Sequence, residues 1–240
     1  TILFAGLHQG HAMPGAGAVE TLNDGKPTGE IEESVSFELG IRGGLGKLFY
    51  EVAFFSTDFE KLLATESLAN NVNSTYNVGD ASSRGVEALL ATDLGDNFGI
   101  GIPISLTATF TDSEFDKLAP DTIGDTFTGA GFYEGAQVGN SFAYIPDTQL
   151  NFRIGLEFDK KSTYLNYHWQ DDVFTTAANQ ESIGSYGILD WSGFYEVNDG
   201  VTAFAKVSNI TDKEYAHSNL PMGYRAGAPR IWSLGMEFDF

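Results

Sequence analysis

The stretch Leu150–Phe158 reads Leu-Asn-Phe-Arg-Ile-Gly-Leu-Glu-Phe, with a large apolar residue at every even position. A period of two places successive side chains on opposite faces of an extended chain, so this stretch predicts a β-strand with one apolar face. The same alternation occurs at residues 35–42, at 104–111 and at 232–240. The spacing of three and four that marks helices is nearly absent, so the chain is predicted to be all-β.

Ten segments show the alternation and are predicted to be the strands of one antiparallel meander. They lie near residues 1–9, 33–43, 47–58, 83–95, 101–116, 143–159, 162–174, 184–197, 201–209 and 229–240. The connections are alternately long, at about 10–32, 59–82, 117–142, 175–183 and 210–228, and short, at 43–46, 95–99, 159–161 and 198–200. Long loops at one end and tight turns at the other are typical of outer-membrane barrels, whereas sandwiches usually mix both lengths.

The two faces of the predicted strands differ in charge. In each predicted strand, one face carries no charged residue over the central stretch. This is typical of strands that cross a bilayer, which need roughly 9–11 tilted residues. Aromatic residues on this uncharged face fit the girdles at membrane interfaces, although a soluble core would also hold them. They are Tyr167, Trp169, Trp191, Tyr195 and Trp232. Together with the loop pattern, this face predicts about ten transmembrane strands.

The composition narrows the class of protein. The 240 residues carry 33 acidic and 13 basic side chains, and the net charge of −20 repels the phosphates of nucleic acids. The chain has no cysteine, which excludes a disulfide scaffold and a cysteine zinc site. Its 19 Phe, 10 Tyr and 3 Trp residues are too many aromatics for a disordered chain. The common nucleophile, zinc-protease and nucleotide-binding motifs are absent from the sequence, so we do not expect an enzyme.

Five short motifs resemble those of TonB-dependent outer-membrane receptors. The segment 209–215, Asn-Ile-Thr-Asp-Lys-Glu-Tyr, is similar to the family's Asn-Leu-x-Asp-x-x-Tyr, with Ile210 where Leu is common. Residues 223–230 resemble its Gly-x-x-x-Gly-x-Pro-Arg entry to the last strand, in a form similar to the ferric dicitrate branch. The remaining matches are Glu-Ser-x-x-x-Glu-Leu-Gly-x-Arg at 33–42, Arg-Gly-x-Glu at 84–87 and Tyr-x-Pro-x-x-x-Leu at 144–150. The five motifs occur in the family's order and together cover most of the chain.

The resemblance implies a fold and a function. Family members are 22-stranded barrels, the plugged class of transporter, so residues 1–240 are expected to be the C-terminal portion of such a barrel, without the plug domain and the earlier strands. The implied function is active import of a ferric chelate, either ferric citrate or a siderophore, across the bacterial outer membrane. The implied partners are the receptor's own plug domain, the TonB complex, lipid and lipopolysaccharide, and the outer-membrane assembly machinery. Iron is expected only within the chelate, with no cofactor bound directly.

Two other classes of protein remain open at this point. One is a stand-alone outer-membrane barrel of ten strands, either a porin or a surface enzyme. The other is a soluble β-sandwich that serves as a binding module, because a sandwich strand also alternates. The sequence upstream of Thr1 would distinguish the first of these from a receptor, and solubility without detergent would favour the second.

The candidate ligand-binding residues are basic or aromatic groups near the predicted loops. They are Arg225, Tyr224, His217, Arg84 and His11. A guanidinium group binds carboxylates in a bidentate manner, so Arg225 and Arg230 offer a pair of forks for an anionic chelate. The alternative is that these two arginines anchor carboxylates of the barrel wall. His8 and His11 lie three apart, but we favour loop histidines over a metal pair and expect no metal site.

A second group of residues is expected to support structure and assembly. It consists of Phe240, Phe238, Arg230, Asn209 and Tyr215. The terminal aromatic on an alternating strand resembles the signal that outer-membrane assembly machinery reads. Glu87, Arg153 and Glu237 are expected to form ion pairs on the wall of the lumen, and His168 is expected to face the lumen.

Overall fold

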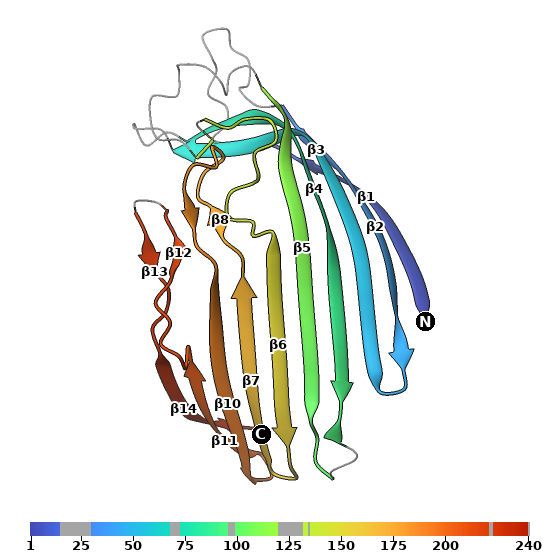
Figure 1. The fold of residues 1–240 in the computed structure, drawn as a ribbon, viewed down its shortest axis with the longest axis vertical. Coiled ribbons are helices and arrows are strands. Elements are labelled where there is room, and N and C mark those ends of the chain that lie inside the picture. Colours follow the sequence, from blue (N-terminus) through green and yellow to red (C-terminus); the bar gives the residue numbers. More distant parts are fainter. Residues whose placement is uncertain are drawn as a thin grey trace.

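The computed structural model describes residues 1–14, 30–67, 73–95, 99–119, 132–133, 135–220 and 223–239. Ten strands form one antiparallel sheet in the order β1-β2-β3-β4-β5-β6-β7-β10-β11-β14 (Figure 1). They are β1 (Ile2–Ala12), β2 (Glu32–Leu45), β3 (Leu48–Ser67), β4 (Asn73–Asp93), β5 (Pro103–Leu118), β6 (Thr148–Glu157), β7 (Lys161–Gln170), β10 (Tyr186–Asn198), β11 (Val201–Ser208) and β14 (Ile231–Phe238). The predicted all-β meander of ten strands is confirmed.

The strand ends divide the sheet into two unlike edges. The turns that join β2 to β3, β4 to β5, β6 to β7 and β10 to β11 lie at the lower edge in Figure 1, which we call the turn end. The strand ends that the other five connections join lie at the opposite edge, the loop end, where two small hairpins also lie. These hairpins are β8 (Val173–Phe174) with β9 (Ser182–Ile183), and β12 (Ala216–Ser218) with β13 (Arg225–Ala226). In the described residues β1 and β14 form the sheet's two margins and do not pair with each other.

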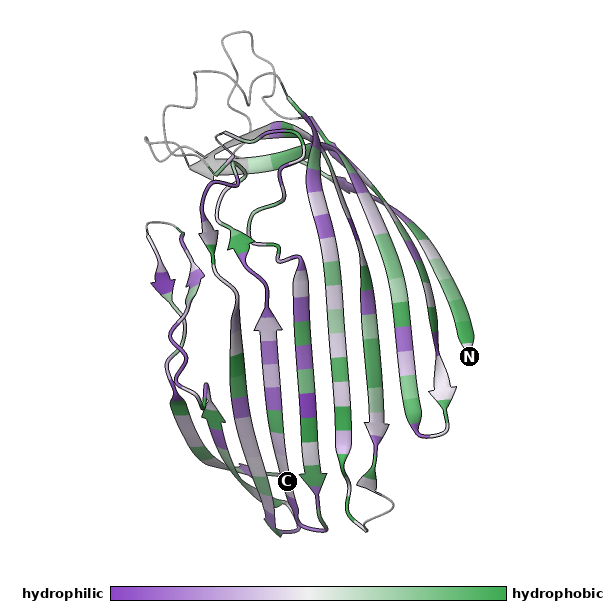
Figure 2. Cartoon of the chain, in the orientation of Figure 1, coloured by the Kyte–Doolittle hydropathy of each residue, from purple (hydrophilic) through white to green (hydrophobic). Residues whose placement is uncertain are grey.

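The register joins the strands so that one face of the sheet is apolar across its whole width. Directly paired residues project to the same side of an antiparallel sheet. Across β4, β5 and β6 the pairs Leu90–Leu106 and Leu106–Phe152 therefore share one side, which we call the apolar face. Leu106 and Phe152 remain 38 % and 39 % exposed, so no protein covers this band. Figure 2 shows the alternation of apolar and polar residues along the strands.

The opposite side, the polar face, carries hydroxyl, amide and charged groups. Thr107 pairs with Asn151, and Asn151 pairs with His168, which places His168 on this face. The predicted separation of the two faces is thus continued from strand to strand by the pairing. No helix in the part of the chain that the structure describes has the length and apolarity needed to cross a membrane.

A small hydrophobic core lies at the loop end. Its buried members are Ala64, Val78, Ala81, Phe115 and Ala177. Segment 139–140 lies against β5, because Phe115 N donates to Asn140 O at 3.0 Å and Gly139 N donates to Phe115 O at 2.8 Å. The side chain of Asn179 bonds both the N–H and the C=O of Ser141, which ties the β7–β10 connection to the β5–β6 connection. The loops therefore support one another.

Two predicted boundaries are wrong. Residues 59–82 were expected to be a long loop, but β3 continues to Ser67 and β4 begins at Asn73. The register shifts between Phe59 and Leu62 and again between Leu62 and Leu63, which marks β-bulges. Because bulges interrupt the alternation of apolar and polar residues, the sequence pattern does not indicate a strand there. The strand predicted from residue 143 begins only at Thr148, because Tyr144 has a φ of +62° and Pro146 has no N–H to donate.

The two faces make opposite predictions for a buried charge. A lysine in place of Leu106 or Ile154 on the apolar face should destabilise the protein by about 2–4 kcal/mol in a bilayer, because the charge would lie in hydrocarbon. A lysine in place of the neighbouring Thr107 should cost far less. Folding into lipid vesicles, followed by denaturant titration, measures the difference. Equal destabilisation at Leu106 and Thr107 would contradict the membrane assignment of the apolar face.

Candidate functional site

The connection between β11 and β14 is held together by one buried amide. Asn209, 2 % exposed, follows β11 with a φ of +51°. Its Nδ2 donates to Lys213 O at 2.9 Å and to Ala228 O at 3.0 Å, and its Oδ1 accepts from Lys213 N at 2.8 Å. Its backbone N–H donates to Asp190 Oδ1 on β10 at 2.7 Å. One side chain therefore joins the start of the connection to its end.

An ion pair closes the same connection beside the buried amide. Arg230 Nη2 lies 3.1 Å from Asp212 Oδ2, and Arg230 N donates to Asp212 Oδ1 at 3.0 Å. These bonds to Arg230, first from its backbone and then from its side chain, lower the pKa of the Asp212 carboxyl. Because the folded-state pKa is lowered, this contribution to stability is present above the unfolded-state pKa of Asp212. It is lost as the pH falls through the folded-state value.

Two tyrosines pack at the base of the connection. The ring centroids of Tyr186 on β10 and Tyr215 lie 4.3 Å apart. Gly227 lies against the Tyr215 ring so closely that a Cβ atom there would overlap it. The motif residues Asn209 and Tyr215, together with Arg230, thus all contact other parts of this connection or of β10. Phe238 lies on β14, on the apolar face opposite Val201, whereas Phe240 lies outside the described residues.

Beyond this closed base, the hairpin of β12 and β13 carries three of the predicted ligand-binding residues. Arg225 pairs with Ser218 across the hairpin, and His217 precedes Ser218 on β12. All three candidates are exposed, and Tyr224 is 63 % exposed. In the described part of the chain Arg225 has no ion-pair partner, in contrast to Arg230 and Arg84. The hairpin therefore presents a free guanidinium at the loop end.

The structure separates the other two predicted ligand-binding residues from the hairpin. Arg84 pairs with Asp112 on the apolar face, and its Nη2 lies 2.9 Å from Glu114 Oε1. His11 pairs with Glu33 on the same face of β1 and β2. Since residues three apart on a strand lie on opposite faces, His8 and His11 cannot share a metal ion. Among the described residues there is no group of three His, Cys, Asp or Glu suited to a metal.

The polar face contains a cavity between β5, β6, β7 and β10 that the sequence did not reveal. It has a volume of about 230 Å³, and its polar lining includes Ser105, Thr107, Asn151, Arg153, Asn166, His168 and Asp190. His168 Nδ1 and Asn151 Oδ1 are 2.8 Å apart, within hydrogen-bond distance.

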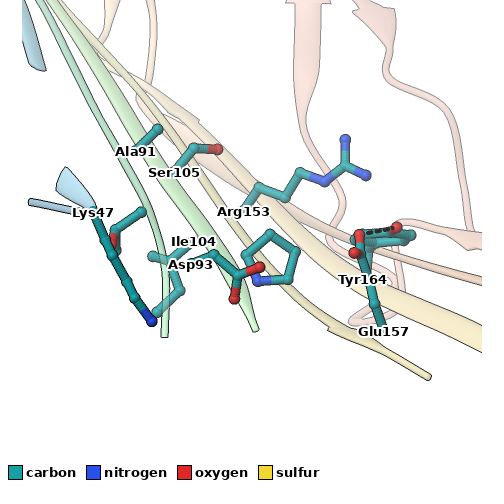
Figure 3. A pocket seen from close by; sticks show the side chains of 10 residues that line it. Lys47, Ala91, Asp93, Ile104, Ser105, Arg153, Glu157 and Tyr164 are labelled. Carbon is teal, nitrogen blue, oxygen red and sulfur yellow. Dashed lines mark hydrogen bonds between the residues drawn. The ribbon is translucent and has the colours of Figure 1, made fainter. Parts of the chain in front are cut away.

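A second cavity, of about 410 Å³, lies toward the turn end and shares Ser105 and Arg153 with the first (Figure 3). Arg153 lies over the ring of Tyr164 at 4.1 Å, and Tyr164 Oη donates to Glu157 Oε1 at 2.6 Å. Asp93 lines the other side, where its Oδ1 accepts from Gly95 N and Ile102 N. Figure 3 shows Arg153 and Tyr164 on one side of the space, with Lys47 and Asp93 on the other.

The ion pairs expected on the wall of the lumen are not formed within the described part of the chain. Glu87 and Glu237 have no ion-pair partner there, and Arg153 contacts the Tyr164 ring instead of a carboxylate. Cation–π stacking takes the place of a salt bridge at this position. His168, which was expected to face the lumen, lies on the polar face of the sheet.

Comparison with known proteins agrees with this architecture. Residues 2–210 match the family described as "TonB dependent receptor-like, beta-barrel". The chain is 26 % identical over 229 residues to the ferric-pyoverdine BN7/BN8 receptor of Pseudomonas putida, covering 93 % of this chain and 25 % of that protein. It is 24 % identical over 199 residues to the probable TonB-dependent siderophore receptor PiuA of Acinetobacter baumannii, covering 82 % of this chain and 25 % of that protein. The chain thus spans about a quarter of the length of these relatives.

Solved structures show the same fold. The ferric yersiniabactin uptake receptor FyuA of Yersinia pestis superimposes with a TM-score of 0.74 at 19 % identity, over 99 % of this chain and 35 % of that one. The siderophore receptor PiuA of Acinetobacter baumannii gives a TM-score of 0.73 at 20 % identity, over 98 % and 33 % of the two chains. The ten strands therefore have the fold of wall strands in outer-membrane β-barrels. The chain belongs to the TonB-dependent receptor β-barrel family, and neither a β-sandwich nor an enzyme is supported.

Replacement of the buried amide tests the closed base of the last connection. Asn209→Ala removes the buried amide and leaves the Lys213 N–H and two carbonyl groups without their partner, so it should destabilise the folded barrel by about 1–3 kcal/mol. The measurement is the temperature at which the full receptor loses its folded, gel-shifted form. Ser208→Ala, at the neighbouring exposed position, serves as the control and should leave that temperature unchanged. A normal melting temperature for Asn209→Ala would show that its bonds do not hold the connection.

Proposed function

We propose that the protein containing this chain imports a ferric chelate across the outer membrane, driven by the TonB complex. The chain would supply part of the barrel wall and several extracellular loops. Two of its relatives are named as ferric-pyoverdine receptors and a third, PiuA, as a probable TonB-dependent siderophore receptor, which supports a siderophore as the substrate class. Ferric citrate is the narrower alternative, suggested by the form of the 223–230 motif.

The observation that carries the proposal is the free guanidinium of Arg225 on an exposed hairpin at the loop end. In a chain with 33 acidic and 13 basic side chains, an anionic chelate needs a local positive group, and few are available. Arg230 is held by Asp212 and Arg84 by Glu114, whereas Arg225 has no such partner in the described residues. A guanidinium fork matches the carboxylate or hydroxamate oxygens of a chelate.

The hairpin also offers two neighbours for the same ligand. Tyr224 adjoins Arg225 with an exposed aromatic ring, and His217 lies one residue before the partner of Arg225 on β12. We keep these three residues as the proposed ligand site. We remove Arg84 and His11 from it, because both lie on the apolar face, away from a ligand that approaches the loops.

The remaining partners belong to the whole receptor. We propose that the polar face meets the receptor's plug domain and that the apolar face meets lipid, with lipopolysaccharide around the loop end. In this arrangement Phe238, together with Phe240, serves the outer-membrane assembly machinery. The stand-alone porin is not favoured, because the relatives are receptors that match most of this chain.

Substitution of Arg225 tests the proposed ligand site. Loss of one charge-assisted bond costs about 1.5–3 kcal/mol, so Arg225→Ala should weaken binding of ferric pyoverdine or ferric citrate by roughly ten- to a hundredfold. The measurement is equilibrium binding of each ⁵⁵Fe-labelled chelate to cells that produce the full receptor. Arg225→Lys keeps the charge but not the forked guanidinium, so its affinity for the chelate should lie between those of the unaltered receptor and Arg225→Ala.

Arg230→Ala is the matched comparison for this experiment. Because Arg230 closes the connection through Asp212, its loss should lower the amount of assembled receptor more than the affinity per receptor. Unchanged affinity of a normally assembled Arg225→Ala receptor for every chelate that the unaltered receptor binds would exclude the anion-binding role of Arg225.

A further inference from the structure

Three adjacent strands give the polar face a stripe that differs from its surroundings. We define the neutral stripe as Ser105, Thr107, Thr109 and Thr111 on β5, Gln149 and Asn151 on β6, and Asn166, His168 and Gln170 on β7. The register joins these residues into rows, such as Thr107–Asn151–His168 and Thr109–Gln149–Gln170. With histidine neutral, no member is charged, and every member can donate and accept hydrogen bonds.

The polar face on both sides of the stripe is different in chemistry. On β2 to β4 it carries Glu38, Glu51, Glu87 and Asp93, and on β10 to β14 it carries Asp190, Glu196 and Glu237. Large rings also project from the flanks, including Phe55 on β3, Phe194 on β10 and Phe204 on β11. In the described strands the stripe itself is thus a path without carboxylates or bulky apolar groups, and the flanks beside it carry mostly carboxylates, together with the cations Arg42 and Lys206.

The stripe connects the two ends of the sheet. At the loop end the stripe reaches Ser113 and Phe115 on β5. Ser113 Oγ accepts a hydrogen bond from Phe142 N of the β5–β6 connection, and Phe115 belongs to the small hydrophobic core. In its middle lies the cavity of about 230 Å³, and this cavity shares Ser105 and Arg153 with the cavity of about 410 Å³ nearer the turn end. The hollowed part of the polar face therefore follows the stripe from its middle toward the turn end.

Transport requires contacts that are favourable enough for entry and weak enough for release. A neutral hydrogen bond contributes about 0.5–1.5 kcal/mol net, and bonds to charged groups about 1.5–3 kcal/mol. A chelate with exposed oxygens can exchange hydroxyl and amide partners step by step along the stripe, whereas the flanking carboxylates repel an anionic chelate. Arg153, 4.1 Å from the centroid of the Tyr164 ring, lies toward the turn end and lines both cavities, and Lys47 is a second cation in the lining of the larger one.

We propose that the neutral stripe is the surface along which the metal chelate moves through the barrel. The chelate would follow the inner side of the wall from the loop end to Arg153. This inference rests on the proposed function, because it assumes that a chelate is transported. It assigns transit to β5, β6 and β7 and gives the other strands of the polar face no role in it. The competing occupant of the stripe is a permanently packed segment of the plug domain.

A single cysteine in the full receptor tests the assignment. The chain has no cysteine of its own, so Thr107→Cys places one thiol in the middle of the stripe. Thr57→Cys is the matched control, because Thr57 lies on the polar face of β3, outside the stripe, and bonds only the Ser36 hydroxyl through its side chain in the described residues. Both thiols are treated in cells with a membrane-impermeant trimethylammonium methanethiosulfonate, and the extent of reaction is measured by mass spectrometry.

The expected result is a loss of uptake without a loss of binding. Modified Thr107→Cys should bind ⁵⁵Fe-labelled ferric pyoverdine or ferric citrate as before but transport it about tenfold more slowly, since the disrupted contacts are worth one or two hydrogen bonds. Removal of the label with a reductant should restore transport. Modified Thr57→Cys should transport at the rate of the unmodified receptor.

Other outcomes overturn the inference. Equal transport by the two modified receptors would show that the stripe is not the route. An unreactive thiol at position 107, or a loss of binding together with transport, would show that packed protein occupies the stripe. The proposed function fails separately, if the unaltered receptor takes up neither chelate.

Discussion

The backbone hydrogen-bond ladder is the constraint on which the rest of this structure depends. Within a bilayer no water satisfies an exposed N–H or C=O group, so each strand must pair along its whole membrane length. That pairing fixes the register, and the register decides which side chains share a face. A shift of one residue in any strand would turn its apolar residues to the polar side and its polar residues to lipid. The position of every site residue on the wall therefore follows from the same ladder that makes the fold possible.

Much of this arrangement could be predicted from the period of the sequence alone. The strands around Leu150–Phe158 and 104–111 alternate so regularly that their faces are fixed without knowledge of their neighbours. The same parity already places Arg84 with Val86 and His11 with Leu7, on the apolar face. The alternation alone therefore excludes Arg84 and His11 from the proposed ligand site, even though both lie close to the loops in the sequence. Where bulges break the period, as at Phe59 and Leu62, the alternation does not continue and the strands could not be predicted.

The cavities of the polar face could not be predicted in this way. They depend on which residues of different strands lie side by side, such as Ser105, Arg153 and Asn166, and the sequence of one strand contains no information on its register with the next. The stacking of Arg153 on Tyr164 is of the same kind. From the sequence, an arginine on an acidic wall predicts an ion pair, but the register brings it an aromatic ring. Gly155 stands opposite Tyr164 and leaves room for that ring.

The last connection combines a base that is closed by hydrogen bonds with an exposed hairpin that carries the proposed ligand site. Asn209, Asp212 and Arg230 satisfy one another at its base, so the polar groups there are unavailable for binding. In the described residues the Arg225 side chain of the hairpin above has no such partner, so its charge is available to a solute. A charged, exposed group is suited to capture, since its bonds are strong, while the neutral groups farther along the wall are suited to release. On the proposed route the order of these chemistries gives the wall a direction, because a chelate that left Arg225 would meet weaker contacts until it reached Arg153. If charged groups lined the whole route, each would retain the chelate, and the energy needed for every step would rise accordingly.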